Sequence, residues 1–280
     1  MKISLYVDFS DIISAKETLV DKLNHLIIQD PKHQMYRSKP LDQILKSLKK
    51  SGVDGLELIV PKILTDKHIQ EVKDIVRENE IPILSIHQSG NNLSSIPTSE
   101  IQRLCEIANN FSAKVITLHS DTLGNKLFNK NFILELKNLQ AKHQIKFGIE
   151  NMPKSPLTLS KTYTFNPNEF SSAINNADLN ITLDTTHLGQ VGGDICEFYL
   201  KNKNKILNIH LSDYRKSWLN KTLLLANDTH LPLTEGELEI TKLLKSLKEN
   251  NYQGLITMEI NGDLNKLCRS AEIIKKAFAD

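Results

Sequence analysis

No run of apolar residues in the 280-residue chain approaches the roughly 18–20 that a membrane-spanning helix needs. The first ten residues, MKISLYVDFS, lack the apolar core of a signal peptide. Cysteine is scarce: Cys105, Cys196 and Cys268 lie far apart and form no C-x-x-C pair, so we expect reduced thiols. Together these absences predict a cytoplasmic protein with no membrane partner.

An excess of charge of one sign is missing as well. The chain has 35 lysines and arginines against 33 aspartates and glutamates, which gives a net charge of +2. This balance is not typical of a protein that binds nucleic acid along a basic surface. A glycine-rich turn is also absent after the first predicted strand, where the sequence reads DFSDII, which disfavours a dinucleotide-binding fold.

Eight short apolar runs, rich in β-branched residues, recur along the chain. Runs of this kind, with little alternation, are typical of strands buried on both faces of a parallel sheet. The predicted strands are residues 2–7, 55–60, 81–87, 115–120, 146–151, 180–185, 206–212 and 255–260. Segments with helical spacing separate them, so the sequence predicts an α/β fold, a single (β/α)8 TIM barrel over residues 1–280. A doubly wound sheet is the alternative.

Metal-competent side chains stand at the ends of six successive predicted strands. In a TIM barrel, the carboxyl ends of the strands form the active site. The six residues are His87, His119, Glu150, Asp184, His210 and Glu259. A single histidine or carboxylate at such a position is more often a satisfied polar residue or a cap, but six converging on one mouth favour a shared metal site.

The charges of this set support the same interpretation. Glu150, Asp184 and Glu259 would repel one another without a cation between them, and no lysine or arginine stands at a strand end to neutralise them. Mixed carboxylate and imidazole ligands suit Zn²⁺, Mn²⁺, Co²⁺ or Fe²⁺ better than Ca²⁺. The motif DTTH adds His187, three residues after Asp184.

The strand ends GIEN, LDTTH, IHLSD and MEI, in this order, resemble those of the xylose isomerase-like TIM-barrel superfamily, which includes sugar phosphate isomerases and epimerases and endonuclease IV. The resemblance to the epimerases implies one divalent metal, Zn, Mn or Co, held by Glu150, Asp184, His210 and Glu259. It further implies that Glu150 and Glu259 are the catalytic acid–base pair and that His187 contacts the substrate.

The resemblance to endonuclease IV implies a larger ligand set. Members of that group hold three zinc ions with nine ligands, and all nine positions are filled here by the right residue type. The additional metal ligands would be His87, His119, His187, Asp228 and His230. The stretches ENMPKSPLT and DTTHLGQVGG depart from that group, however, and no DNA-reading loop is visible after the first strand.

Two long polar stretches interrupt the pattern, residues 24–40 and 213–236. The second holds Trp218, the only tryptophan, with Arg215, Lys216 and Lys221 near it. Trp218 either anchors this loop to the barrel or belongs to a lid over an anionic substrate, in which case Arg215, Lys216 and Trp218 are substrate-binding. Further on, HLPLTEG resembles an H-x-P-x-G-x-G turn of sugar-phosphate isomerase-like proteins, with Thr234 where glycine is usual.

Three functions follow from these patterns. The first is a divalent-metal-dependent isomerase or epimerase that acts on a sugar or sugar phosphate by proton transfer next to a metal-bound carbonyl. The alternative is a multi-zinc phosphodiesterase, with abasic-site DNA or a small phosphodiester as substrate, and only this alternative involves nucleic acid. The third is a barrel that binds metal or ligand without catalysis. The sequence leaves a homodimer open.

Overall fold

The protein is described by a computed structural model in which residues 1–8, 41–61, 64–89, 93, 95–120, 126–153, 166–216 and 228–279 are placed. Eight parallel strands close into a barrel in the order β1-β10-β7-β6-β5-β4-β3-β2. These strands are β1 (Lys2–Asp8), β2 (Gly55–Val60), β3 (Ile83–Gln88), β4 (Val115–His119), β5 (Lys146–Glu150), β6 (Asn180–Asp184), β7 (Ile206–Leu211) and β10 (Leu255–Met258). The predicted (β/α)8 barrel is therefore confirmed, and the doubly wound alternative is wrong because the sheet closes.

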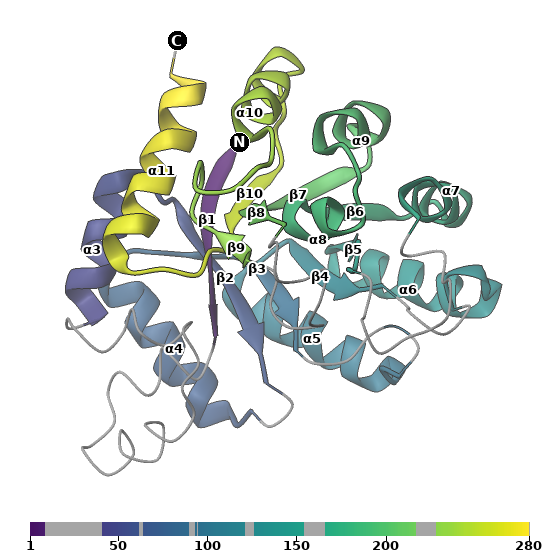
Figure 1. The fold of residues 1–280 in the computed structure, drawn as a ribbon. Helices are drawn as coiled ribbons and strands as arrows, with labels where there is room; N and C mark the ends of the chain where they lie inside the picture. Colours follow the sequence, from purple (N-terminus) through teal and green to yellow (C-terminus); the bar gives the residue numbers. More distant parts are fainter. Residues whose placement is uncertain are drawn as a thin grey trace.

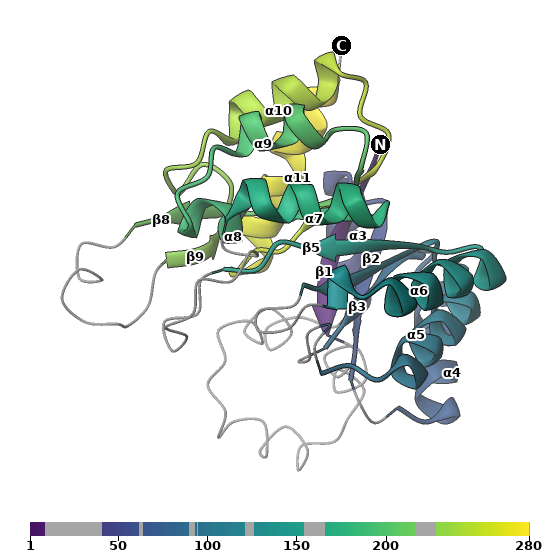
Figure 2. The same cartoon turned by 90° about the vertical axis from the view of Figure 1, so that its right-hand side faces the viewer.

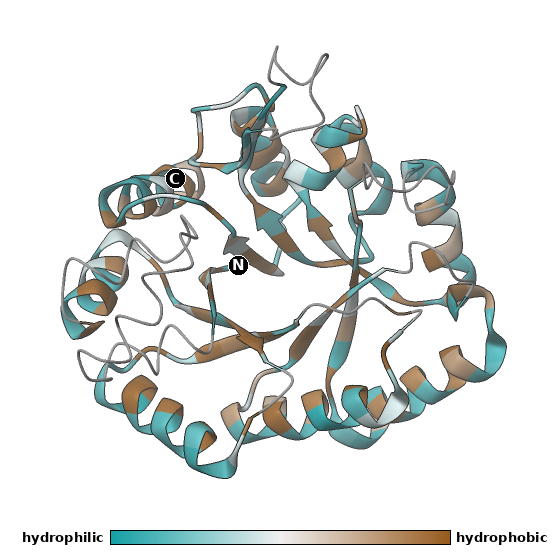
Figure 3. Ribbon diagram, turned by 60° about the horizontal axis from the view of Figure 1, so that its bottom comes forward, coloured by the Kyte–Doolittle hydropathy of each residue, from teal (hydrophilic) through white to brown (hydrophobic). Residues whose placement is uncertain are grey.

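Helices surround the barrel, as Figures 1 and 2 show from two directions. They are α3 (Leu41–Ser51), α4 (Asp66–Glu78), α5 (Thr98–Phe111), the short 3₁₀ helix η2 (Lys126–Phe128), α6 (Lys130–His143), α7 (Pro167–Ala177), α8 (Thr185–Gln190), α9 (Ile195–Asn202), α10 (Ile240–Glu249) and α11 (Leu264–Phe278). In Figure 3 the strands are largely hydrophobic, whereas each outer helix carries residues of both kinds. Among the described residues, no helix combines the length and apolar character that a membrane crossing requires.

Local sequence explains where these helices begin and end. Helix α3 buries a stripe that includes Ile44, Leu45 and Leu48, and it is followed by Gly52 at a φ of 106°. A positive φ of this size is a conformation that glycine adopts without steric cost. Helix α4 begins after Thr65, whose side chain accepts a hydrogen bond from the backbone N–H of His68.

The register of the strands brings the polar strand ends to one mouth of the barrel. His119 is the register partner of Glu150 across β4 and β5, and Asp184 is the partner of His210 across β6 and β7. Side chains of register partners point to the same face of a sheet, so each pair faces the barrel interior together. Glu259 directly follows β10, which ends one residue earlier.

The segment after β7 differs from the sequence-based expectation. Two short antiparallel strands, β8 (Asp213–Arg215) and β9 (Asp228–Leu231), form a small separate sheet where residues 213–236 were expected to have little regular structure. Figure 2 shows them beside the barrel, at the left of the view. Trp218, Lys221 and the polar stretch 24–40 lie outside the described residues.

Candidate metal centre

Glu150 is the central side chain of the mouth. Its carboxylate is buried, and one oxygen, Oε2, lies 3.2 Å from Nε2 of His87 and 3.6 Å from Nε2 of His119. The other oxygen, Oε1, lies 3.1 Å from Nδ1 of His187 and 3.8 Å from Nδ1 of His210. Glu150 thus connects histidines that come from four different elements of the barrel.

Glu259 and Asp184 complete the mouth on the side of β6 and β10. Oε2 of Glu259 lies 3.1 Å from Nδ1 of His210, and Oε1 lies 3.9 Å from Nδ1 of His230. Asp184 places Oδ1 2.7 Å from the backbone N–H of His187, which caps helix α8, while Oδ2 lies 3.4 Å from Nδ1 of the same histidine. The motif DTTH therefore explains why helix α8 starts after Asp184 and why the Asp184 carboxylate points as it does.

Several buried atoms of this mouth make no hydrogen bond to any described residue. Three of them are Oδ2 of Asp184, Nδ1 of His210 and Oε2 of Glu259. Buried polar atoms without partners are costly in a folded protein. These three belong, together with Glu150, to one group whose ligand atoms all lie within 4.8 Å of one another. Ligand atoms around a tetrahedral ion stand about 3.3 Å apart, so the separations of 3.1 and 3.8 Å from His210 suit ligands of a shared cation.

Electrostatics in the mouth differ from the expectation that the carboxylates simply repel one another. Burial raises the pKa of the Glu150 carboxyl, but hydrogen bonds from the surrounding histidines outweigh burial and hold this pKa well below its usual range. Burial is likewise outweighed at Glu259, where His230 and His210 lower the carboxyl pKa. Glu150 does repel Glu259 and raises its carboxyl pKa, but the neighbouring imidazoles outweigh this repulsion.

Asp184 is the exception. Burial raises the pKa of its carboxyl, His187 and His230 offset this only in part, and Glu259 and Glu150 add to the rise. The pKa values of His187 and His210 are raised as well, but by neighbouring negative charge and not by burial. Burial lowers the pKa of His187, but the charges of Asp184 and Glu150 outweigh burial and raise it to about 9. His210 has a pKa well above its usual value for the same reason, with Glu57 as the largest opposing charge.

Most of the predicted ligands are brought together, and one is not. Three further groups of potential ligand atoms lie in the barrel: His87 with His119 and Glu150, Asp184 with His187 and His230, and Glu57 with His87 and His210. Asp228 is exposed at the start of β9 and belongs to no such group among the described residues. The nine-ligand pattern is thus one member short in the described structure.

The predicted substrate contacts on the loop after β7 are only partly described. Arg215 is exposed, and its guanidinium donates a hydrogen bond to the carbonyl oxygen of Glu235. Lys216 is exposed as well. His187 is mostly buried and faces the mouth. Substrate binding by these residues stays a prediction.

The turn HLPLTEG, which resembles the H-x-P-x-G-x-G turn of sugar-phosphate isomerase-like proteins, is occupied by a side chain of the protein itself. The carboxylate of Asp213 accepts hydrogen bonds from the backbone N–H groups of Thr234, Gly236 and Leu238, at 3.1, 2.9 and 3.0 Å. Converging backbone N–H groups of this kind form a site for an anion. Here that anion is Asp213, and Thr234 adopts a φ of 72° where glycine is usual.

Two residues of the mouth were not predicted from sequence. Glu57 lies in the middle of β2, and Tyr6 lies in β1, where its ring packs edge-on against His87 with centroids 5.1 Å apart. Burial, followed by the charges of Glu259, Glu150 and Glu57, holds the pKa of the Tyr6 hydroxyl well above its usual value. A carboxylate inside the apolar run GLELIV was a usable signal for Glu57, because charged residues are almost never fully buried without partners. Tyr6 offered no such signal.

Known proteins with solved structures share this architecture. A D-tagatose 3-epimerase-like protein is 20% identical with a TM-score of 0.67, over 99% of this chain and 97% of its own. A D-allulose 3-epimerase from Methylomonas sp. is 12% identical with a TM-score of 0.67, over 99% and 98% of the two chains. A xylose isomerase-like TIM-barrel protein from Mycobacterium smegmatis, solved in complex with magnesium, is 18% identical with a TM-score of 0.63, over 85% and 89%.

Similarity extends to sequence. An uncharacterized protein of Methanocaldococcus jannaschii is 25% identical over 247 residues, which cover 80% of this chain and 77% of that protein. The family model described as xylose isomerase-like TIM barrel matches residues 45–278. This match includes seven of the eight barrel strands and every polar strand end of the mouth. The chain belongs to the xylose isomerase-like TIM-barrel family.

Proposed function

We propose that the protein is a divalent-metal-dependent isomerase or epimerase that acts on a sugar. The observation that carries the proposal is the group of Glu150, Asp184, His210 and Glu259, in which three buried atoms lack hydrogen bonds and face a common centre. Three carboxylates and one imidazole form a donor set that suits Zn²⁺, Mn²⁺ or Co²⁺. A cation there would stabilise negative charge that develops on a substrate oxygen.

The side chains of the mouth supply the remaining chemistry. The lowered pKa values keep Glu150 and Glu259 ionised at neutral pH, as a group that removes a proton has to be. They reach the mouth from β5 and from the end of β10, so a sugar carbon between them could lose a proton to one carboxylate and gain a proton from the other after that group has been protonated from solvent. His187, protonated and close to both Glu150 and Asp184, would donate a hydrogen bond to a substrate oxygen.

The class of sugar is narrowed by the turn after β9. Asp213 already fills the backbone N–H groups of Thr234, Gly236 and Leu238, so a substrate phosphate has no free donors there. We therefore favour a sugar without phosphate at this position. The names of the similar solved structures, a D-tagatose 3-epimerase-like protein and a D-allulose 3-epimerase, point to the same class of substrate.

A second candidate is a multi-zinc phosphodiesterase. It is favoured by the groups His87–His119–Glu150 and Asp184–His187–His230, each of which shares one residue with the proposed metal centre and could hold a further ion. Exposed Asp228 counts against it, because the third ion would lack a ligand. We expect one tightly bound metal per chain.

Two measurements test the proposal. Elemental analysis of protein purified without chelator should give about one divalent metal per chain, whereas about three zinc ions would favour the phosphodiesterase. NMR in deuterated water should show exchange of a sugar C–H beside the carbonyl when unphosphorylated ketoses are supplied with Mn²⁺, Co²⁺ or Zn²⁺. The Asp184→Asn variant is the control for metal dependence. Hydrolysis of a phosphodiester without any such exchange would refute the isomerase.

A further inference from the structure

A buried carboxylate outside the proposed metal ligands lies directly beneath the mouth. Glu57 comes from the middle of β2, and its side chain has no exposed surface. Tyr6 of β1 and Ser85 of β3 are its register partners on the two sides. Since register partners share a face, all three side chains point into the barrel. A charge in this position requires partners.

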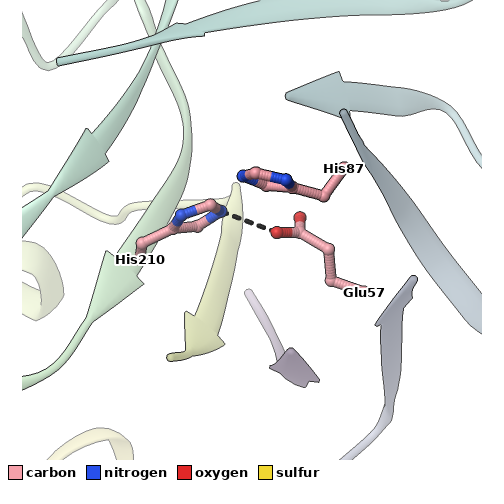
Figure 4. Close-up of side chains that lie close together, drawn as sticks. All are labelled: Glu57, His87 and His210. Atoms are coloured by element: carbon pink, nitrogen blue, oxygen red, sulfur yellow. Dashed lines mark ion pairs between the residues drawn. The ribbon is translucent and has the colours of Figure 1, made fainter. Parts of the chain in front are cut away.

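The partners of Glu57 divide between its two oxygens. Oε2 accepts hydrogen bonds from the hydroxyl of Ser85 and from Nδ2 of Asn208, the second at 2.8 Å. Oε1 lies 2.7 Å from Nε2 of His210, an ion pair that Figure 4 marks with a dashed line. This contact does not have the geometry of a hydrogen bond, and neither atom of the pair makes a hydrogen bond to another described residue. Each is therefore the other's closest partner.

The orientation of Asn208 is itself fixed. Its Oδ1 accepts a hydrogen bond from the hydroxyl of Thr257 at 2.9 Å. The Thr257 hydroxyl also forms a hydrogen bond with the hydroxyl of Ser4 at 2.7 Å. Nδ2 of Asn208 is thereby directed at Glu57. Asn208 and His210 are two residues apart on β7, so both point into the barrel and both contact the same carboxylate.

His210 uses its two ring nitrogens for opposite purposes. Nε2 faces Glu57, whereas Nδ1 faces Glu259 at 3.1 Å and Glu150 at 3.8 Å. An anion beside Nε2 favours retention of the proton on that nitrogen, so the proton that a metal displaces from His210 comes from Nδ1, which faces the mouth. We propose that Glu57 is a positioning residue that fixes the tautomer of His210, so that Nδ1 can bind the metal. The proposal rests on the proposed metal centre and does not depend on the reaction.

A second ion between Glu57, His87 and His210 is the other use of this group, and the contacts argue against it. Both ring nitrogens of His87 already have partners, Nδ1 with the carbonyl oxygen of Gln88 at 2.7 Å and Nε2 with Glu150 at 3.2 Å. One oxygen of Glu57 is taken by two donors. Figure 4 shows the ring of His210 beside the carboxylate of Glu57 and the ring of His87 above both.

The Glu57→Gln variant tests the proposal. Ser85 and Asn208 both donate to the position of Oε2, so the amide oxygen should take that place and the amide NH₂ should face His210. That NH₂ would require Nε2 to accept, which moves the proton to Nδ1 and removes the ligand lone pair. We expect metal affinity to fall by at least ~10–100-fold, measured for Zn²⁺ and Mn²⁺ by competition with a chromophoric chelator. Wild-type affinity in this variant would overturn the proposal.

The matched control is Ser85→Ala. It removes one donor to Glu57 but leaves the contact between Oε1 and His210, so metal affinity should stay within about threefold of wild type. An equal loss in Ser85→Ala and Glu57→Gln would show a general disturbance of the barrel interior and would overturn a tautomer-specific role. Thermal melting of both variants in chelator shows whether each is folded before metal is added.

A measurement on the unmodified protein covers the case in which Glu57→Gln does not fold. In the zinc-loaded protein labelled with ¹⁵N-histidine, NMR should show His210 with a proton on Nε2 and metal on Nδ1. Metal on Nε2 would overturn the proposal. No binding of any divalent metal by the wild type would instead refute the proposed metal-dependent function, and the positioning role with it.

Discussion

Asn151 and Asp184 bind each other through two hydrogen bonds. Oδ1 of Asn151 accepts from the backbone N–H of Asp184 at 2.8 Å, and Nδ2 of Asn151 donates to the carbonyl oxygen of Asp184 at 2.9 Å. The carbonyl oxygen of Asn151 is in turn 3.0 Å from Nδ1 of His187. Asn151, the residue after β5, therefore fixes the backbone at the end of β6. That backbone carries Asp184, a proposed metal ligand, and leads to His187, a proposed substrate contact.

Replacing this clamp should weaken both the fold and the metal centre. Asn151→Ala would leave a buried N–H and a buried C=O without partners, so we expect a loss of about 1–3 kcal/mol in the free energy of unfolding, measured by urea denaturation in chelator. Asn151→Asp keeps the acceptor but loses the donor, and should rank between Ala and wild type in stability. Equal stability of Asn151→Ala and wild type would contradict a structural role for the clamp.

In the metal-free protein, the variants Asp184→Asn and Glu150→Gln should differ in their free energy of unfolding. Asp184 has a raised pKa, so its ionised form is disfavoured in the folded protein, and Asp184→Asn removes that cost while retaining an oxygen to cap helix α8. We expect its metal-free stability to lie within ~1 kcal/mol of wild type or above it. Glu150 has a lowered pKa, so its ionised form stabilises the fold above the ordinary carboxyl pKa, and Glu150→Gln should lose about 3 kcal/mol at pH 7. Urea denaturation in chelator would measure both, and the reverse order would show that the histidines do not compensate Glu150.

Turnover should depend on both proposed acid–base residues. Glu150→Gln and Glu259→Gln each remove a proton-transfer group, and we expect turnover to fall by at least ~10²–10⁴ with saturating metal. Saturation matters because each glutamate is also a proposed ligand. Steady-state kinetics on a sugar identified by deuterium exchange would measure the effect. Near-normal turnover in both variants would rule out these roles.

Metal affinity should fall as the pH is lowered. In the metal-free protein the pKa of His187 is raised to about 9 and that of His210 is raised well above its usual value, so both are protonated at neutral pH. A metal binds only the deprotonated nitrogen of His210, so binding has to release a proton, and affinity should drop by up to about tenfold for each pH unit below neutrality. Calorimetry in two buffers with different ionisation enthalpies would count the protons released. Binding without proton release would contradict the raised pKa of His210.

The turn at Thr234 should be improved by glycine. A β-branched residue at a φ of 72° is strained, and its side chain is exposed. Thr234→Gly keeps the backbone N–H that donates to Asp213, so we expect the free energy of unfolding to rise by ~0.5–1 kcal/mol. Thr234→Ala is the control, since alanine retains a β-carbon at the same φ. A loss of stability in the glycine variant would show that the threonine side chain has a role of its own.

Periodicity in the sequence determined the barrel, because the composition of a buried parallel strand and the stripe of a helix are local properties. The predicted strand of residues 55–60 coincides with β2, and the others differ from the observed strands by at most a few residues at their ends. The polar strand ends followed from the same reasoning, since parallel strands deliver their carboxyl ends to one mouth.

Tertiary structure decided which atoms of that mouth meet. Asp228 has the residue type of a ligand but is exposed, while Glu57 of β2 contacts His210 of β7, which is three strands away in the barrel. Asp213, which carried no prediction, fills the turn that resembled a phosphate site. These outcomes depend on how the strands are staggered and where each side chain points once the barrel closes, and such distances arise between residues far apart in the chain. Sequence therefore determined the polar groups at the ends of the strands, and packing determined which of them share a centre and which further residues join them.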